Sequence, residues 1–410
     1  MNVSADDLFS LRLASDDDME LIMQAHSRVF GTRSDTRHRA NWKRQTNVDD
    51  ILLAVEKHGR EEKFVGTAMY YDMTLGLPGG TEIAAAGGGM SLVEPTHRRR
   101  GIFRSMYSEL LRLAQSRHYP VLVGMPSQGT IYRRFGRGPA SQAQSLVIDR
   151  RRATLCVPTR TAYTVQCREA AETVQVIPSL YRAYAAVTPG AVSRSDAWWD
   201  LYFESGSIGS HIESRRFYFT HPEGYATYRI QEHAGGSAVV KVEELCASTD
   251  EAHSDLWDAV LGLEAFDTVV AETSPSDPLP LKLVDLRAAR IADLRDVMWL
   301  RILDVPVALS ARGYTVDGEV VIGVEDPLDL SGGTFRLRAI DGTGYCDRID
   351  TDTKPDLVLT LDNLSSLYLG GFDAHQLASA GRLHVNNPSA LSTAESLFRS
   401  NVRPFCNTYF

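Results

Sequence analysis

Long apolar runs and paired cysteines are both missing from this 410-residue sequence. Its apolar runs, such as residues 121–123, are far shorter than the ~20 residues of a membrane-spanning helix. Residues 1–7 are polar and acidic, unlike the basic start of a secretory signal. The five cysteines form no CxxC pair, which argues against a disulfide framework and a zinc site. We therefore expect a cytoplasmic protein that binds neither membranes nor metals; export without a signal peptide is the alternative.

Basic residues are also fewer than acidic residues. The chain has 43 Lys and Arg against 52 Asp and Glu, a formal net charge of −9. Nucleic-acid binding requires a basic face, so we expect no nucleic-acid partner. The negative charge raises the local concentration of cationic ligands instead. Hydrophobic residues make up 43% of the chain and charged residues 23%, which is typical of a globular protein. The length predicts two or three domains.

Residues 1–150 have the pattern of an α/β unit. Strands are predicted at residues 11–13, 51–55, 64–71, 84–93 and 121–123, and helices at 16–29 and 101–116. In the second helix, Phe103, Met106, Leu110 and Leu113 recur at helical spacing. A strand, a helix and a strand in this order predict a parallel crossover.

Residues 151–300 repeat this plan weakly. Strands are predicted at 217–219, 224–230, 238–242 and 268–271, and a helix at 249–263 with Thr249 as its cap. This helix opens with Asp250 and Glu251, where the first unit has arginines. Carboxylates at a helix start make a poor phosphate site, so we expect a related second domain without a cofactor site. The Pro-rich residues 274–280 are predicted to form a loop within it.

Residues 301–410 change character and predict a small α+β domain. Alternating strands are expected at 316–324, 334–340 and 357–361, and helices near 363–369, 374–380 and 388–398. Strands first and helices last distinguish this range from the two α/β units before it.

The segment 90–104 carries the chemistry of the first unit. A strand runs into the basic turn His97-Arg98-Arg99-Arg100, and Gly101 opens a helix. A helix start presents backbone N–H groups beside the positive end of the dipole, which is a ready anion site. Arginines add charge there, and a glycine lets a pyrophosphate approach the backbone closely. The alternative interpretation is a solvated basic turn that binds nothing.

Two motifs carry a resemblance to known proteins. Arg98-x-x-Gly101-x-Phe103 resembles the pyrophosphate loop of the GNAT acetyltransferase superfamily, Gln/Arg-x-x-Gly-x-Gly/Ala, with Phe103 in place of a small residue. The same turn, residues 129–140 and a chain that ends in Phe410 resemble the enhanced intracellular survival (Eis) acetyltransferases of actinobacteria. The resemblance implies tandem GNAT-like domains, the second without the cofactor loop, and a C-terminal domain like sterol carrier proteins.

The resemblance also implies site residues. Acetyl-CoA would be held by Ser91, Leu92, Val93, Arg99, Arg100, Gly101, Ile102, Phe103, Arg104, Ser127 and Gln128. Tyr132 would be the general acid, and the carboxylate of Phe410 the general base. Apart from the resemblance, Trp42 is a candidate for lining the amine pocket, because an aromatic wall can hold a cation; a packing role is the alternative.

These roles suit acetyl transfer from a thioester. An alkyl amine is mostly protonated at neutral pH, so a base must take a proton before the amine attacks. A tyrosine hydroxyl can protonate the leaving thiolate, and no covalent intermediate is needed. Without the resemblance, Tyr132 and the aromatic residues 404–410 would be interpreted as packing residues.

The leading hypothesis is therefore an acetyl-CoA-dependent N-acetyltransferase acting on aminoglycosides or related polyamine antibiotics. One alternative is acetylation of lysine amines in proteins or peptides. Another is a non-catalytic module that binds acetyl-CoA or a lipid. The resemblance further implies a homohexamer.

Overall fold

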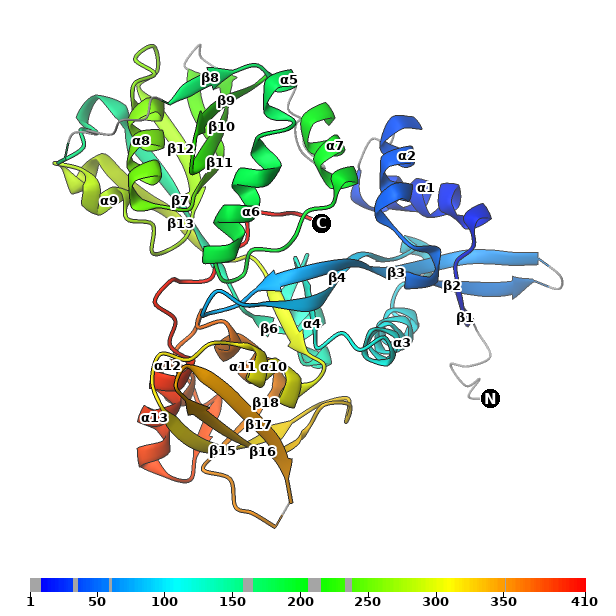
Figure 1. Cartoon of the computed structure of the whole chain (residues 1–410). Coiled ribbons are helices and arrows are strands. Elements are labelled where there is room, and N and C mark those ends of the chain that lie inside the picture. The colour runs from blue at the N-terminus through cyan, green and yellow to red at the C-terminus, as the bar shows by residue number, and fades with distance from the viewer. Residues whose placement is uncertain are drawn as a thin grey trace.

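The computed structural model describes residues 9–31, 36–58, 61–157, 165–205, 215–232, 238–350 and 352–410. The acidic residues 1–7 lie outside these ranges. Three β-sheets with flanking helices build the described chain, and the C-terminus returns to lie between the first two sheets (Figure 1). No helix among the described residues is long and apolar enough to cross a lipid bilayer.

The first sheet has the strand order β1-β2-β3-β4-β5-β14-β6 in the described chain. Its strands are β1 (Ser10–Leu13), β2 (Ile51–His58), β3 (Glu61–Gly76), β4 (Glu82–Val93), β5 (Val121–Gly124), β14 (Trp299–Ile302) and β6 (Gly138–Pro139). The helices beside it are α1 (Met19–Phe30), α2 (Thr36–Gln45), α3 (Ile102–Ser116) and α4 (Gly129–Tyr132). The strands and helices predicted for residues 1–150 are confirmed. The pattern does not predict α2, because Ala40 and Trp42 are its only apolar residues.

The predicted parallel crossover is formed by β4, α3 and β5. Residues 85–87 of β4 pair in parallel with residues 121–123 of β5. α3 packs on one face of the sheet through its buried residues Ile102, Met106, Tyr107, Leu110, Leu111 and Ala114. The spacing of these residues places them on one side of the helix, which is why the sequence predicts it well.

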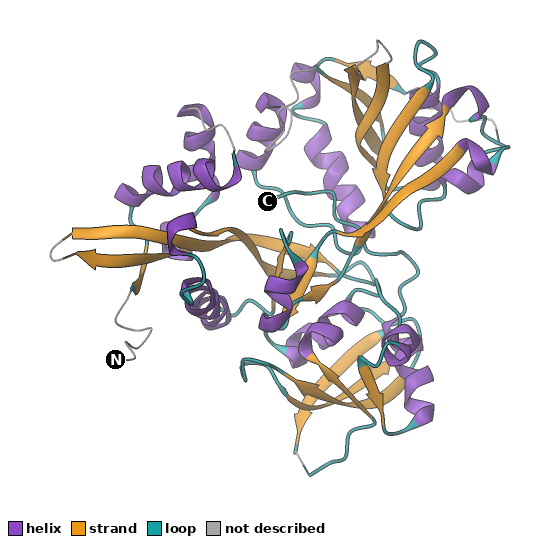
Figure 2. Cartoon of the chain, turned by 180° about the vertical axis from the view of Figure 1, so that it is seen from behind, coloured by secondary structure: helices purple, strands orange, loops and turns teal. Residues whose placement is uncertain are grey.

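The second sheet has the order β13-β7-β12-β11-β10-β9-β8 in the described chain. Its strands are β7 (Gln142–Asp149), β8 (Gln166–Arg168), β9 (Arg216–His221), β10 (Gly224–Glu232), β11 (Ala238–Ala247), β12 (Thr268–Thr273) and β13 (Ala289–Asp296). One face packs against α8 (Asp250–Leu261) and α9 (Leu279–Lys282), the other against α6 (Ile177–Val187) and α7 (Asp196–Ser205); α5 (Ala170–Thr173) precedes α6 (Figure 2).

The strands and the helix predicted for the second unit are confirmed. The Thr249 hydroxyl accepts a hydrogen bond from the Ala252 N–H at 3.3 Å, so Thr249 caps α8 as expected. The predicted loop at 274–280 ends earlier than expected, because α9 begins at Leu279. The pattern does not predict α6 and α7, whose buried faces are built largely from Tyr and Trp.

The two sheets exchange strands across the ranges 1–150 and 151–300. β14 begins at the end of the second range, runs two residues past it, and pairs with β5 and β6 of the first sheet. β7 comes from the first range but lies between β12 and β13 of the second sheet. Both units are therefore completed by a strand from the other part of the chain.

The third sheet has the order β17-β16-β15-β18-β19 in the described chain. Its strands are β15 (Gly318–Glu325), β16 (Gly333–Ile340), β17 (Thr343–Ile349), β18 (Leu357–Thr360) and β19 (Leu383–Val385); its helices are α10 (Val305–Ala311), α11 (Leu361–Tyr368), α12 (Ala374–Ser379) and α13 (Pro388–Phe398). The predicted strands and helices are confirmed. The expectation that all helices follow the strands is wrong, because α10 precedes them, with the Asp304 carboxylate accepting from the Val307 N–H at 3.0 Å.

Two ion pairs, one of them fully buried, join the third domain to the first. Arg301 on β14 and Asp326 lie 2.8 Å apart, and both side chains are fully buried. Arg133, just after α4, pairs with Asp362 at 2.7 Å. Because breaking a buried ion pair leaves an uncompensated charge, the Arg301–Asp326 pair holds the two domains in one arrangement. That arrangement determines where residues 404–410 leave the third domain.

Candidate active site

β4 and β5 separate near the middle of the first sheet. Their parallel pairing ends at Gly87 and Val123. Beyond this point β4 bulges at Met90, whose φ is 47°. The described ladder between the two strands therefore ends before residues 91–93.

The start of α3 faces this opening. Gly101 is the N-cap with a φ of 82°, and Arg99 has a φ of 64°. The first intrahelical bond runs from the Ser105 N–H to the Gly101 carbonyl at 3.1 Å. The N–H groups of residues 102–104 thus precede the first helical bond and point out of the helix start. α3 has 15 residues, so its positive end adds to the attraction for an anion.

A cavity of about 550 Å³ lies between this helix start, β4 and α4. The lining contains every implied cofactor residue except Arg100, namely Ser91, Leu92, Val93, Arg99, Gly101, Ile102, Phe103, Arg104, Ser127 and Gln128, together with Tyr132. Val29, Phe30, His97, Arg98, Ile131, Arg134 and Phe135 complete it. Four of these residues are exposed arginines, so the cavity has a basic rim suited to a polyphosphate.

Arg100 is directed away from the cavity. Its guanidinium donates to Glu56 at 2.8 Å, and the same carboxylate lies 3.1 Å from the His97 ring. His97 is 4% exposed, and its other ring nitrogen lies 2.7 Å from the Thr96 hydroxyl. These contacts fix the turn on β2, so Arg100 braces the arginine turn in this structure.

Tyr132 lies at the end of α4 and is 7% exposed. Its ring packs edge-on against Phe103 and Tyr107, at centroid distances of 6.0 and 5.6 Å. The Arg137 guanidinium lies 4.9 Å from the Tyr132 ring centre and donates to the Tyr107 hydroxyl at 2.8 Å. Phe103, which stands where the GNAT pattern has a small residue, fills space beside Tyr132 and stacks on Tyr107.

Phe410 reaches the opposite face of the same sheet. A Cβ on Gly87 would lie 3.2 Å from the Phe410 ring, so the absence of a side chain at Gly87 makes room for it. Phe410 packs with the apolar cluster that contains Ala85 and Val123, whereas Tyr132 packs with the cluster that contains Ala86 and Leu122. Because neighbouring strand residues face opposite sides of a sheet, the two residues flank the separation of β4 and β5 from opposite faces.

Trp42 is linked to Phe410 through Tyr71 and does not line the arginine-rimmed cavity. Its indole N–H donates to the Tyr71 hydroxyl at 3.1 Å, and the Tyr71 ring packs edge-on against Phe410 at 6.4 Å. Burial raises the pKa of Tyr71 to about 12. The three aromatic side chains therefore form one neutral wall at the end of the chain.

Within the described part of the second domain, the turn before α8 has no arginines. α8 opens with Asp250 and Glu251 after its Thr249 cap. Across the part of the chain that the structure describes, no three His, Cys, Asp or Glu side chains are grouped to hold a metal ion.

Comparison with known proteins identifies the family. Family models for a GNAT acetyltransferase domain match residues 10–140 and 190–302, and a sterol carrier protein domain matches residues 305–407. The N-acetyltransferase Eis of Mycobacterium tuberculosis is 34% identical over 368 residues, covering 88% of this chain and 89% of that protein. The chain belongs to the Eis family of GNAT N-acetyltransferases. It is therefore an enzyme that transfers acetyl groups from acetyl-CoA to amines.

Another relative is also an N-acetyltransferase by name, and two solved structures share the fold. An uncharacterized N-acetyltransferase of Streptomyces griseus is 31% identical over 362 residues, covering 84% of this chain and 86% of its own. The crystal structure of Eis1 from Mycobacterium abscessus superposes with a TM-score of 0.86 at 28% identity, covering 98% of this chain and all of that chain. A GCN5-related N-acetyltransferase from Anabaena variabilis shares the fold, with a TM-score of 0.83 at 21% identity. The predicted fold class, tandem GNAT domains followed by a sterol-carrier domain, is confirmed.

Sequence patterns miss several residues of this Eis-family site. Val29 and Phe30 enter the cavity from the end of α1, and Tyr71 enters the aromatic wall from β3. No local motif marks them, because they are brought together by sheet topology. Arg134 lies two residues after Tyr132, within the stretch that resembles the Eis family. The resemblance could therefore have pointed to it as a cavity residue.

Replacing both Arg99 and Arg104 by Ala is expected to raise the KM for acetyl-CoA. Both side chains line the cavity, and a hydrogen bond to a charged group is worth ~1.5–3 kcal/mol, so the rise should be about tenfold or more at low salt. Screening by salt should reduce the difference between the variant and the wild type. Arg112→Ala, which removes an exposed arginine paired with Glu109 on the same helix, is the control. An unchanged KM would contradict a phosphate-binding role.

Proposed function

We propose that this Eis-family enzyme acetylates the amines of aminoglycosides or related polyamine antibiotics by direct attack on acetyl-CoA. One observation carries the proposal: the arginine-rimmed cavity meets the separation of β4 and β5, with Tyr132 and Phe410 on opposite faces of it. A thioester in the opening would have a hydroxyl on one side and the chain end on the other.

The cavity supports one orientation of acetyl-CoA. Its pyrophosphate would lie at the N–H groups of residues 102–104 and the arginines around them. The pantetheine arm would pair with the backbone of residues 91–93 like an added strand. Ser127 and Gln128, at the start of α4, would contact the arm from the other side. The acetyl end would then point along β4 towards Gly87, where the ring of Phe410 lies.

The roles of the two flanking groups follow from the reaction. The carboxylate of Phe410 takes a proton from the ammonium group, which leaves a neutral amine to attack the thioester carbon. The tetrahedral intermediate collapses by breaking the C–S bond. Tyr132 donates its hydroxyl proton to the departing CoA sulfur, and the second proton that the attacking nitrogen loses reprotonates the Tyr132 oxygen. Trp42, linked to Phe410 through Tyr71, would hold the cationic substrate by cation–π contact.

The substrate class rests on charge and on the family. A net charge of −9 favours polycations, and aminoglycosides carry several ammonium groups. Acetylation of protein or peptide lysines uses the same chemistry and is the second candidate. The non-catalytic alternative, a module that only binds acetyl-CoA or a lipid, does not agree with membership of the N-acetyltransferase family. A homohexamer, implied by the resemblance, belongs to the same proposal and is checked by sedimentation of the purified protein.

Release of CoA thiol distinguishes the two candidates. Thiol release from acetyl-CoA is measured with a panel of aminoglycosides, with lysine-containing peptides and with no amine. The proposal expects rapid release with aminoglycosides and slow release with peptides. Preference for peptides would favour the second candidate. Acetyl-CoA binding without any amine-dependent thiol release would contradict the proposal.

A further inference from the structure

The last seven residues, 404–410, form a tail. This tail approaches the first sheet along the second domain. The Phe405 N–H donates to the carbonyl of Pro189 at 2.9 Å. The Asn407 amide donates to the Cys246 sulfur at 3.2 Å. The tail is therefore attached to the second domain before it reaches its last three residues.

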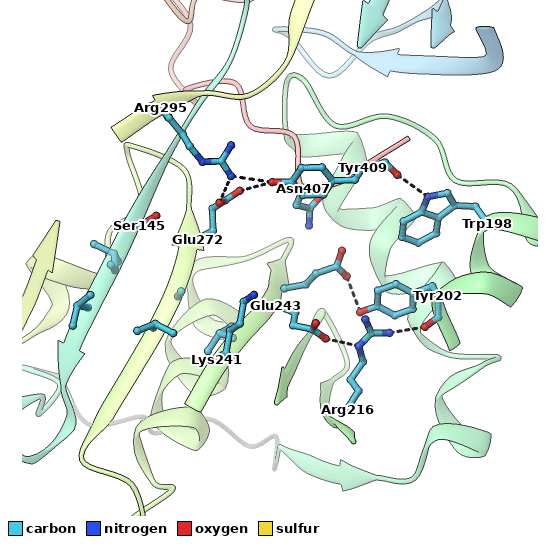
Figure 3. Close-up of a pocket in the computed structure, with 16 residues that line it drawn as sticks. Ser145, Trp198, Tyr202, Arg216, Lys241, Glu243, Glu272, Arg295, Asn407 and Tyr409 are labelled. Atoms are coloured by element: carbon cyan, nitrogen blue, oxygen red, sulfur yellow. Dashed lines mark hydrogen bonds and ion pairs between the residues drawn. The ribbon is translucent and has the colours of Figure 1, made fainter. Parts of the chain in front are cut away.

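The penultimate residue is attached as well. The Trp198 indole N–H donates to the Tyr409 carbonyl at 3.3 Å, and the Tyr409 hydroxyl bonds to Glu272 and to Arg295, each at 3.0 Å (Figure 3). Tyr409 also borders a cavity of about 570 Å³ on this face of the second sheet. Tyr409 thus turns towards the second sheet, while the ring of Phe410 turns towards the first.

Thr408 is the most deeply buried of the tail residues that form hydrogen bonds with the second domain. It is 0% exposed, and its hydroxyl accepts from the Arg194 Nε–H at 2.9 Å. The Tyr181 hydroxyl uses its own proton on the Val192 carbonyl at 2.8 Å, so Thr408 donates to the Tyr181 oxygen at 2.9 Å. The Thr408 hydroxyl thus donates one hydrogen bond and accepts one, and both partners are side chains of the second domain.

Arg194 is itself held rigidly. Its side chain is 0% exposed and pairs with Glu244 at 2.5 Å. The guanidinium lies over the rings of Tyr181 and Trp198, 3.7 and 4.1 Å from their centres. A buried cation with an ion partner and two aromatic faces has few other positions available, so Arg194 presents its Nε–H to Thr408 in one direction.

We propose that the second GNAT-like domain is a clamp that positions the terminal carboxylate, and that Arg194 acts through Thr408 as its positioning residue. This inference rests on the proposed role of Phe410. Phe410 lies two residues beyond Thr408, at most ~7 Å of extended chain, so a shift at Thr408 is passed directly to the carboxylate. A misplacement of about 1 Å can cost a hundredfold in rate. The second domain therefore serves catalysis by holding the tail.

Thr408→Val tests the clamp with little change of shape. The variant loses the hydroxyl that bonds Arg194 and Tyr181, while Arg194 keeps Glu244 and Tyr181 keeps Val192. The expected result is a fall in kcat of about tenfold to a hundredfold with an unchanged KM for acetyl-CoA. Thr408→Ser restores the hydroxyl and should restore kcat. The control is Thr393→Val on α13, whose hydroxyl bonds only the Ser389 carbonyl of its own helix among the described residues and should not matter.

The same substitution in a shortened chain separates positioning of the Phe410 carboxylate from a general effect on the stability of the protein. Thr408→Val is also introduced into a chain that ends at Tyr409. If the clamp acts through the Phe410 carboxylate, the substitution should lower kcat less than twofold there, because the group it positions is gone. Equal losses of kcat in both backgrounds would mean a structural role and overturn the proposal. No loss in the full-length chain would overturn it as well.

Carboxypeptidase A gives a readout that does not depend on activity. The protease removes an accessible C-terminal phenylalanine, so release of Phe410 reports how firmly the tail is held. Release should be faster from Thr408→Val than from the wild type or Thr408→Ser, and equal rates would overturn the clamp. If the chain ending at Tyr409 keeps full activity while Thr408→Val still speeds release, the proposed base is wrong and the anchoring of the tail stands.

Discussion

Replacing Tyr132 by phenylalanine is expected to lower kcat by ~10²–10⁴-fold. The change removes one hydroxyl and keeps the ring that packs against Phe103 and Tyr107. The cavity should therefore keep its shape, and the Kd for acetyl-CoA should change little. Without a proton donor, the CoA thiolate must leave as an anion, which slows collapse of the tetrahedral intermediate. Steady-state thiol release and calorimetric titration of acetyl-CoA measure the two quantities.

Tyr119→Phe is a matched control in the same domain. Its hydroxyl donates to Asp72 at 3.0 Å, outside the arginine-rimmed cavity, so its loss should leave kcat near the wild-type value. Near-normal turnover of Tyr132→Phe would remove the tyrosine from the mechanism. A rise in the acetyl-CoA Kd as large as the fall in kcat would instead indicate that the hydroxyl binds the cofactor.

Adding residues after Phe410 is expected to abolish activity while the fold survives. A peptide bond at this position removes the proposed base, and the extension must also pass the contact with Gly87 and Tyr71. Loss of a general base costs ~10²–10⁴-fold in rate. Because the arginine-rimmed cavity lies on other elements, acetyl-CoA binding should be retained. Thiol release at saturating aminoglycoside measures the first effect and titration of acetyl-CoA the second.

The control for this experiment is the same extension attached before residue 1 instead of after Phe410. It leaves the carboxylate of Phe410 intact, and kcat should be unchanged. An enzyme that remains active with a C-terminal extension would show that another group takes the proton from the amine. Unfolding of the extended chain, visible as a lower thermal midpoint, would be a different result, since it would lower the affinity for acetyl-CoA as well.

Local patterns are enough to predict most of the elements. α3 is predictable because Met106, Leu110 and their neighbours repeat at helical spacing and are buried. The arginine turn is predictable because Gly101 and the basic residues before it form a compact motif at a strand–helix junction. Interactions of this kind lie within a few residues, so their physical cause is present in the sequence itself.

Contacts between distant parts of the chain are what the patterns miss. Nothing near Arg194 or Thr408 in the sequence indicates that the two side chains meet, 214 positions apart. Arg100 has the same local context as Arg99, and only the position of Glu56 on β2 directs its side chain out of the cavity. The family resemblance supplies roles for Tyr132 and Phe410, but the opposite faces on which they lie depend on the pairing of β4 with β5.

The exchange of β7 and β14 has a consequence for the chain as a folding unit. A fragment that stops at residue 150 would lack β14 and would leave the hydrogen-bonding edge of β5 uncovered, with β7 deprived of both neighbours. Open strand edges pair with other chains, so such a fragment should aggregate when it is expressed alone. Neither GNAT unit can thus be shed by a simple truncation, which ties the unit without the arginine turn to its partner through the backbone itself.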